Sequence, residues 1–302
     1  EKYQSIQRNF ETYEDYCNIK LPAKFTYQKN NNQIKSNVSK NQFKNYVKKA
    51  KEYIAKGDVF QVVLSQRFER KINKTPLEIY NHLRLSNPSP FMFYFNFEDF
   101  KIIGSSPEIL VRLRDGQITV RPIAGTRPRG NTKAQDLKYA RELLKDKKEL
   151  AEHLMLLDLG RNDVGKVSKI NTVKVTESFT IEKYSHVMHI VSNVVGKFDH
   201  KNSIFETLLS GFPAGTVSGA PKIRAMEIID DLEKNKRKLY AGGIGYFTPG
   251  KEFDTCITLR TALIKDNKFY VQSGAGIVAD SVPEKEYQET VNKAKALMRA
   301  VD

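Results

Sequence analysis

The sequence predicts an α+β fold, with large antiparallel β-sheets packed as a sandwich and helices outside. Stretches typical of strands outnumber helical patterns, and many of these strands are close neighbours in the sequence, which favours antiparallel pairing. Strands and helices do not alternate regularly, as they would in a parallel sheet. A chain of 302 residues with 40% hydrophobic content is also long enough to build a full core.

The expected elements follow from local spacing. A helix begins after Ser39, a suitable N-cap, and its apolar residues recur at helical spacing until Gly57. A strand is expected from Val59 to Arg67. Further helices are expected at 75–84, 133–157, 203–210, 221–234 and 283–301. Further strands are expected at 91–96, 101–103, 109–113, 117–121, 172–182, 188–197, 242–248, 253–264 and 268–273.

Residues 1–38 are polar and weakly periodic, so we expect a lead-in segment, the remnant of or linker from a missing N-terminal region, before one domain over 39–302. No apolar run suits a signal peptide or a membrane span of about 18 residues. We therefore expect a cytoplasmic protein without a membrane partner.

The net charge of +15 raises the possibility of nucleic-acid binding. However, the lysines are scattered and form no basic stripe interleaved with aromatic residues, so a generally basic surface and no nucleic-acid partner are expected. Such a surface also attracts a small dianionic substrate. Cys17 and Cys256 lack metal-ligand spacing and are expected to be ordinary thiols.

Two acidic runs suggest a metal site. Glu149 and Glu152, and likewise Glu286 and Glu289, are three residues apart and share a helix face. If the two helices face each other, four carboxylates converge, and a hard cation, Mg²⁺ first, suits such oxygen ligands. The alternative is that each run is a solvated helix face.

Two glycine-rich segments suggest anion binding. Gly211–Lys222 ends where Pro221 can start a helix, and Gly274-Ala275-Gly276 leads toward the second acidic helix. Backbone amides can approach an anion closely at such sites, although tight structural turns explain both segments as well.

Five further residues have both a structural and a functional interpretation. Arg260 could bind a carboxylate, Tyr240 could donate to one, and Lys293 could pair with Glu289 or with a ligand. Glu108 lies where burial could make it a general acid, whereas His189, on an apolar strand, is most often a core residue.

Five strings, taken together and in this order, resemble the chorismate-binding enzymes, and most closely their anthranilate synthase component I branch. The resemblance extends over about residues 39–302, which would then be the catalytic domain. The strings are Pro122-Ile-Ala-Gly-Thr126, Leu157-Asp-Leu-Gly-Arg-Asn-Asp163, Phe212-Pro-Ala-Gly-Thr-Val-Ser-Gly-Ala-Pro-Lys222, Tyr240-Ala-Gly-Gly-Ile-Gly-Tyr and Gly274-Ala-Gly-Ile.

This resemblance implies roles for the candidate residues. Glu152 and Glu289 would be the principal Mg²⁺ ligands, supported by Glu149 and Glu286. The substrate would be chorismate. Tyr240 and Arg260 would bind its enolpyruvyl carboxylate, and Gly125 and Thr126 would line its ring. Its ring carboxylate would be bound by Thr216, Gly274, Ala275, Gly276 and Lys293. Glu108 resembles the acid that protonates the departing C4 hydroxyl, and His189 the residue near the enolpyruvyl side chain.

The resemblance also points to a product. Relatives that add water carry a lysine base at the position of Gln61, and relatives that form aminodeoxychorismate carry a nucleophilic lysine at Ala124. Neither lysine is present, which favours anthranilate and pyruvate, made from chorismate and ammonia in the first committed step of tryptophan biosynthesis. An aminodeoxychorismate synthase and an isochorismate or salicylate synthase remain alternatives, as do a nucleic-acid-binding protein and an inactive regulatory fragment.

Neither cysteine resembles a glutaminase nucleophile, so ammonia is expected from solution or from a separate glutamine amidotransferase subunit, component II. Another string resembles part of a tryptophan feedback site, whose other part would lie in the missing region. We therefore expect weak or absent tryptophan binding. The residues of this partial site are Asn87, Pro88, Pro90, Phe91, Met92 and Phe93.

Overall fold

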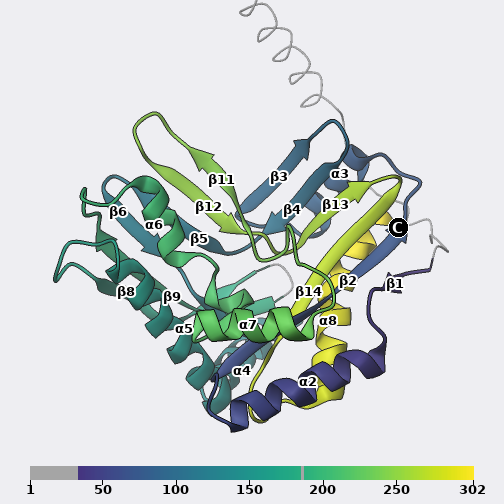
Figure 1. Cartoon of the computed structure of the whole chain (residues 1–302), viewed down its shortest axis with the longest axis horizontal. Coiled ribbons are helices and arrows are strands. Elements are labelled where there is room, and N and C mark those ends of the chain that lie inside the picture. The colour runs from purple at the N-terminus through teal and green to yellow at the C-terminus, as the bar shows by residue number, and fades with distance from the viewer. Residues whose placement is uncertain (1–32, 185–186) are drawn as a thin grey trace, which may run out of the picture. The chain divides into compact units, whose positions relative to one another are not determined.

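The computed structural model describes residues 33–184 and 187–302. The described residues up to Val301 belong to one compact unit, which contains two seven-stranded antiparallel sheets (Figure 1). This confirms the expected α+β class. Of the expected lead-in segment, residues 1–32, with Cys17, lie outside the described residues, and Lys35–Ser36 form a short strand, β1. The expected domain boundary stays a prediction.

In the first sheet the strand order is β1, β2, β14, β13, β4 and β3, and β10 pairs with β2. The long strands β2 and β14 lie side by side through its middle (Figure 1) and pair from Lys71 opposite Lys268 to Val62 opposite Ile277. The bounds of these strands are Gln61–Lys71 (β2), Phe91–Asn96 (β3), Lys101–Ser106 (β4), Gly219–Ala220 (β10), Thr261–Lys265 (β13) and Lys268–Ile277 (β14).

In the second sheet the order is β11, β12, β5, β6, β9 and β7, and β8 pairs with β9. Hairpin neighbours in the sequence make half of these pairs, namely β5–β6, β8–β9 and β11–β12, as expected for antiparallel topology. The bounds are Ile109–Arg114 (β5), Gln117–Val120 (β6), Ile123–Pro128 (β7), Lys174–Lys183 (β8), Val187–Lys197 (β9), Gly243–Phe247 (β11) and Phe253–Ile257 (β12).

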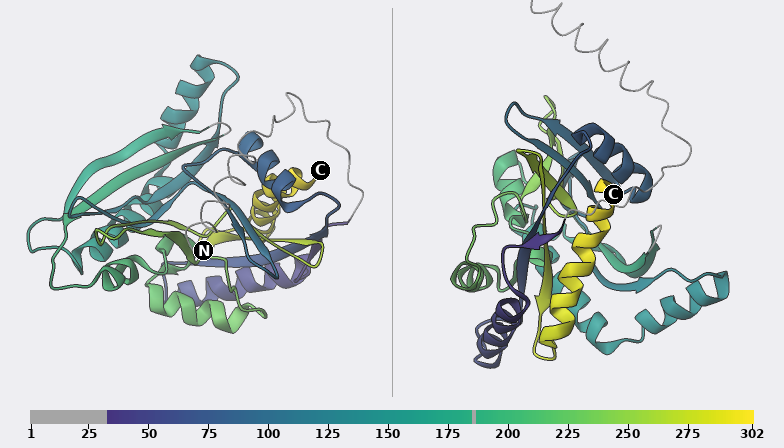
Figure 2. Two further views of the ribbon diagram at one scale, coloured as in Figure 1. Left: turned by 90° about the horizontal axis from the view of Figure 1, so that it is seen from above. Right: turned by 90° about the vertical axis from the view of Figure 1, so that its right-hand side faces the viewer.

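Helices cover both sheets. Helices α2 and α7 share one core with β2 and β14 (Figure 2, left), while α3 and α8 share another with β4, β13 and β14. Helix α5 packs against β6, β7 and β9 of the second sheet. The bounds are Lys40–Ala55 (α2), Pro76–Ser86 (α3), Lys133–Leu143 (α4), Lys147–Gly165 (α5), Ile204–Gly211 (α6), Lys222–Leu232 (α7) and Pro283–Met298 (α8), with 3₁₀ turns η1 at Gly215–Val217 and η2 at Arg299–Val301.

Two elements that were expected to be continuous are each divided into two. The helix expected over 133–157 is two helices, because the Asp146 side chain accepts hydrogen bonds from the amides of Lys148 and Glu149 and thereby starts α5. The strand expected over 253–264 is also divided, since β12 and β13 belong to different sheets and Arg260 between them has a φ of 47°.

Three strands were not expected from the sequence: β1, β7 and β10. Strand β7 follows Pro122, ends at Pro128 and contains Gly125, so its sequence is more typical of a loop. In the part of the chain that the structure describes, no helix is both long and apolar enough to cross a bilayer.

The Asp146 cap yields a test of how α5 is anchored. Asp146 also accepts from Arg127 Nη2 at 2.7 Å, so Asp146→Ala removes a helix cap and an ion pair together. We expect a loss of about 1–2 kcal/mol in the free energy of unfolding, measured by urea denaturation. Asp158→Ala, an exposed change in the middle of the same helix, is the control and should cost less. Equal losses would contradict the anchoring role.

Candidate active site

The two acidic helices do present carboxylates to one place. Glu149 and Glu152 lie one turn apart on α5, and Glu286 and Glu289 one turn apart on α8. Burial, together with the charges of Glu149 and Glu289, raises the pKa of Glu152 to about 7. The pKa of Glu286 is also raised, first by burial, and the charge of Glu289 contributes. These couplings place all four groups in one acidic cluster.

Two cations neutralise part of the cluster. Arg127 Nη1 lies 3.1 Å from Glu149 Oε1, and Lys293 Nζ lies 2.7 Å from Glu289 Oε1. Glu152 has no ion pair among the described residues, although it is the member with the strongly raised pKa. A half-buried carboxylate without a counter-ion, beside two other carboxylates, is the environment that a hard cation stabilises.

The residues therefore fit Mg²⁺ in donor chemistry. Within residues 33–184 and 187–302, however, no three His, Cys, Asp or Glu side chains are already arranged to hold a metal ion. Glu149 and Glu289 are turned toward Arg127 and Lys293, so a bound ion would compete with these two pairs.

The glycine segment of β14 lies against the cluster. Gly274 and Gly276 pair with Ser65 and Val63 of β2, whereas pairing with β13 stops at Val271. The second edge of this segment is therefore not covered by β13. A Cβ on Gly276 would lie 2.6 Å from Gln61 Nε2 and 3.7 Å from Glu152 Oε1, so glycine permits this close approach.

Two polar side chains frame the same segment. A Cβ on Gly274 would lie 2.7 Å from the Tyr240 hydroxyl, and Lys293 Nζ donates to the Gly274 carbonyl at 3.0 Å. Burial raises the pKa of Tyr240 to about 12, so its hydroxyl remains a neutral donor. The Oε1 atom of the buried Gln61 has no hydrogen-bond partner. Unpaired buried polar atoms are uncommon and mark this region as one suited to a ligand.

Glu108 lies at the start of β5 in the second sheet and is buried. Burial raises the pKa of its carboxyl to about 8, opposed by the Thr216 hydroxyl and by the charges of Arg260 and Lys293. Thr216 Oγ1 lies close enough to Glu108 to lower this pKa, although it forms no well-aligned hydrogen bond. At neutral pH the Glu108 carboxyl therefore carries a proton that it can donate.

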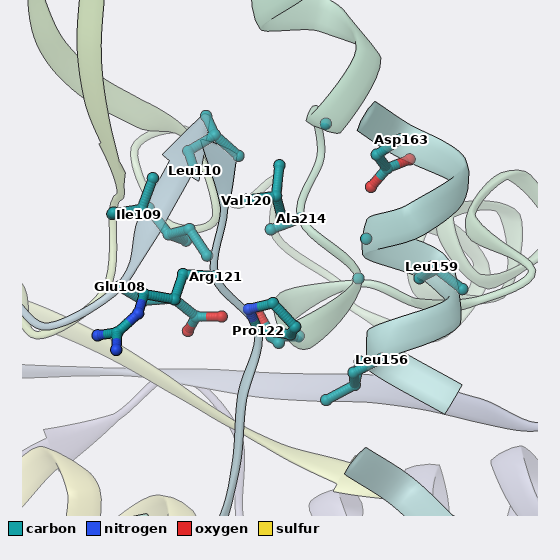
Figure 3. Close-up of a pocket in the computed structure, with 15 residues that line it drawn as sticks. Glu108, Ile109, Leu110, Val120, Arg121, Pro122, Leu156, Leu159, Asp163 and Ala214 are labelled. Atoms are coloured by element: carbon teal, nitrogen blue, oxygen red, sulfur yellow. The ribbon is translucent and has the colours of Figure 1, made fainter. Parts of the chain in front are cut away.

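A small cavity of about 30 Å³ lies beside Glu108, enough for roughly one water molecule. Thr216 also lines it, and Figure 3 shows Glu108 and Asp163 on opposite sides of it. Asp163 is bound to Lys222 Nζ at 2.6 Å, which ties the start of α7 to α5. The glycine-rich segment that carries Thr216 is thus fixed at its end by a buried ion pair.

His189 on β9 is a neutral base by geometry. Its Nδ1 lies 2.9 Å from the Gly125 carbonyl and 3.1 Å from Thr126 Oγ1. Because a carbonyl can only accept, Nδ1 carries the hydrogen and Nε2 keeps a free lone pair. Burial lowers the pKa of His189 to about 4, opposed by the Gly125 carbonyl. The Arg260 and Lys293 charges reach both His189 and Glu108, so these groups share one site.

Arg260, in the segment between β12 and β13, supplies a free cation. Its guanidinium is half-buried and has no hydrogen bond or ion pair in the described part of the chain. Burial lowers its pKa, and the nearby Tyr184 and Glu108 oppose this. A desolvated guanidinium without a partner can bind a carboxylate in a fork geometry.

The remaining predicted groups lie elsewhere or are inert. Asn87 is the C-cap of α3, and the partial tryptophan site continues through Pro88 and Pro90 into β3 at the edge of the first sheet. The Asn87 carbonyl accepts a hydrogen bond from the Ser105 hydroxyl. The backbone amide of Ser105 donates to the Arg260 carbonyl. Cys256 is buried in β12, and burial raises the pKa of its thiol to about 11, as expected for an unreactive cysteine.

Sequence reasoning missed two arginines of the site. Arg127 follows directly after Thr126 in the same string and could have been found as a cation opposite Glu149. Arg237 lies in the basic run from Lys234 to Lys238, where nothing distinguishes it from surface lysines.

The two antiparallel sheets therefore share one site in which carboxylates and cations lie close together, as in an enzyme that binds an anionic substrate. The profile described as chorismate binding enzyme matches residues 1–299, and the chain belongs to this family. This confirms the resemblance carried by the sequence strings.

Within this family, the chain is similar to proteins named anthranilate synthase component 1. The chain is 61% identical to anthranilate synthase component 1 of Cereibacter sphaeroides over 270 residues and 57% identical to that of Aquifex aeolicus over 268, in each case 89% of this chain and 54% of the relative. It thus spans about half the length of these curated relatives. The crystal structure of anthranilate synthase component I from Streptococcus pneumoniae TIGR4 superposes with a TM-score of 0.85 at 40% identity, covering 97% of this chain and 66% of that one.

The acidic cluster predicts a response to Mg²⁺ that needs no turnover. Added Mg²⁺ should raise the melting temperature of the protein by a few degrees, because it binds the folded state only. Glu152→Gln should abolish most of this rise, whereas the exposed Glu142→Gln should keep it. Calorimetry measures both, and an equal rise in the two variants would refute the site.

Glu108 predicts a pH dependence of stability. Its pKa is raised in the folded state, so its contribution to stability is complete below about pH 4.5 and is lost as the pH rises through about 8. Glu108→Gln, which mimics the protonated form, should match the stability of the wild type at low pH. Above pH 8 its free energy of unfolding should exceed that of the wild type by on the order of 5 kcal/mol, because each unit of the pKa shift corresponds to about 1.4 kcal/mol. Urea titrations at several pH values test this, with the exposed Glu98→Gln as control. Parallel profiles for wild type and Glu108→Gln would show that the carboxyl is not perturbed.

Proposed function

We propose that this chain converts chorismate and ammonia into anthranilate and pyruvate with the help of Mg²⁺. The observation that carries the proposal is the convergence of a protonated buried carboxyl, a neutral histidine and two cations beside the acidic cluster. Similarity to proteins named anthranilate synthase component 1 supports the choice of reaction.

Substrate binding would rest on the cations. Chorismate carries two carboxylates; Arg260 and Tyr240 would bind that of the enolpyruvyl group, and Lys293, Thr216 and the Gly274–Gly276 backbone would surround that of the ring. Gly125 and Thr126 would line the ring. Mg²⁺, held by Glu152 and Glu289 with support from Glu149 and Glu286, would supply positive charge at the ring carboxylate.

Proton transfer would be divided between two residues. As ammonia forms a bond to C2, the C4–oxygen bond breaks, and the Glu108 proton passes to the departing oxygen, which leaves as water. The pKa of about 8 keeps Glu108 protonated for this step near neutral pH. Loss of the enolpyruvyl group as pyruvate and of the ring proton at C2 then gives the aromatic amine. His189, with its free Nε2, would lie near the enolpyruvyl group for this elimination.

Gln61 and Ala124 support ammonia rather than water or an enzyme nucleophile. Both are buried, and neither an amide nor a methyl group can act as a base or form a covalent adduct. An aminodeoxychorismate synthase, or an isochorismate or salicylate synthase, is the second candidate. One solved structure from Bacillus anthracis, described as a putative 2,3-dihydroxybenzoate-specific isochorismate synthase, has 26% identity to this chain and a TM-score of 0.80, which keeps this candidate open.

The source of ammonia would be a partner. The buried Cys256 thiol is unsuited to glutamine hydrolysis, so we assign this step to a glutamine amidotransferase subunit or to free ammonia. We place the reaction in the cytoplasm, at the start of tryptophan biosynthesis. The partial tryptophan site from Asn87 to Phe93, the absence of a nucleic-acid or membrane partner and the catalytic domain over 39–302 stay predictions.

Turnover of chorismate tests the proposal. The protein, chorismate, Mg²⁺ and an ammonium salt should yield fluorescent anthranilate and pyruvate, identified by mass. Omitting the ammonium salt should abolish the product, because no other nucleophile is available at Gln61 or Ala124. Salicylate, isochorismate or a non-aromatic aminodeoxychorismate as the product would establish the second candidate instead.

A further inference from the structure

A buried ion pair outside the predicted site joins Glu233, the C-cap of α7, to Arg237. The guanidinium is bidentate, with Nη2 lying 2.6 Å from Glu233 Oε1 and Nε 2.9 Å from Oε2. The Arg237 and Glu233 side chains are only 13% and 6% exposed. An ion pair at the protein surface is usually solvated and weak, whereas this one is removed from water.

The two side chains of this pair form their other hydrogen bonds with two other segments of the chain. Arg237 Nη1 donates to the Val217 carbonyl at 2.7 Å, and Nη2 donates to the Val63 carbonyl at 2.6 Å. Glu233 Oε1 accepts from the Ser65 amide at 2.7 Å and from its hydroxyl at 2.9 Å. Burial of the two charges is therefore offset by a nearly complete set of partners.

One of these segments carries a group that the proposed function assigns to the substrate, and the other pairs with the strand that carries such groups. Val217 follows Thr216 in η1. Val63 and Ser65 lie opposite Gly276 and Gly274 in the β2–β14 ladder. The Arg237 guanidinium also lies 5.4 Å from the centroid of the Tyr240 ring, in a cation–π contact.

We propose that Arg237, fixed by Glu233, is a positioning residue that sets Thr216, Tyr240 and the Gly274–Gly276 backbone relative to one another. The inference rests on the proposed function, since those three groups would bind the two carboxylates of chorismate. Only a planar fork can reach the Val217 and Val63 carbonyls while it holds both Glu233 oxygens, so lysine cannot replace Arg237.

Kinetics of Arg237→Lys test the proposal. Misplacing three binding groups should raise the KM for chorismate about 10- to 100-fold and lower kcat much less. Arg112→Lys is the matched control, because Arg112 forms a similar pair with the buried Asp254 at 2.9 Å between β5 and β12. It should leave KM unchanged. Glu233→Gln is the second variant and should raise KM in the same direction, even if Arg237→Lys does not fold.

A spectroscopic readout separates positioning from general stability. With 3-fluorotyrosine incorporated, the ¹⁹F resonance of Tyr240, assigned by its loss in Tyr240→Phe, should shift in Arg237→Lys and not in Arg112→Lys. An unchanged resonance and KM together with a lowered melting temperature would reduce the pair to a structural role. Absence of chorismate turnover in the wild type would instead refute the proposed function, and the ¹⁹F shift would still decide whether Arg237 places Tyr240.

Discussion

The structure depends on holding like charges together. The carboxylates of the acidic cluster come from α5, which packs on the second sheet, and from α8, which packs on β14 of the first. Their repulsion opposes the approach of these two parts. It contributes, after burial, to the raised pKa of Glu152. Arg127 and Lys293 offset part of it. A bound cation would offset the repulsion that remains between the carboxylates. Binding of the ion and the approach of the two helices would therefore favour each other.

Burial then acts on two other groups in opposite chemical senses. It raises the pKa of Glu108 and lowers that of His189, because in each case the charged form loses water. Both groups are thereby neutral near pH 7, one as a proton donor and the other as a proton acceptor. Environments that separate two pKa values in this way are typical of acid–base sites. The acid directly precedes β5 and the base lies in β9 of the same sheet, while Lys293, whose charge affects the pKa of both, comes from α8.

Much of this could be predicted from the sequence where the signal is local. Spacing of three along each helix was enough to place the four glutamates in pairs, and Ser39 caps α2 as expected. The division of 253–264 could not be read, because its apolar pattern continues through Arg260 and only the left-handed backbone there redirects the chain. Arg237 was hidden for another reason. Its significance comes from Val63 and Val217, residues distant in sequence, and a basic run gives no sign of such partners.

The segment between β12 and β13 shows why the site needs both sheets. This segment leaves the second sheet at Ile257 and enters the first at Thr261, so Arg260 lies where the two sheets are connected. Its φ of 47° is unfavourable for a residue with a side chain, and burial of an unpaired guanidinium adds to that cost. The packing of the two sheets, which hold the segment at both of its ends, offsets these two unfavourable contributions. A carboxylate that pairs with Arg260 would offset the cost of burying its unpaired charge, whereas the cost of its backbone conformation would remain. The ligand-free site therefore favours the binding of an anion.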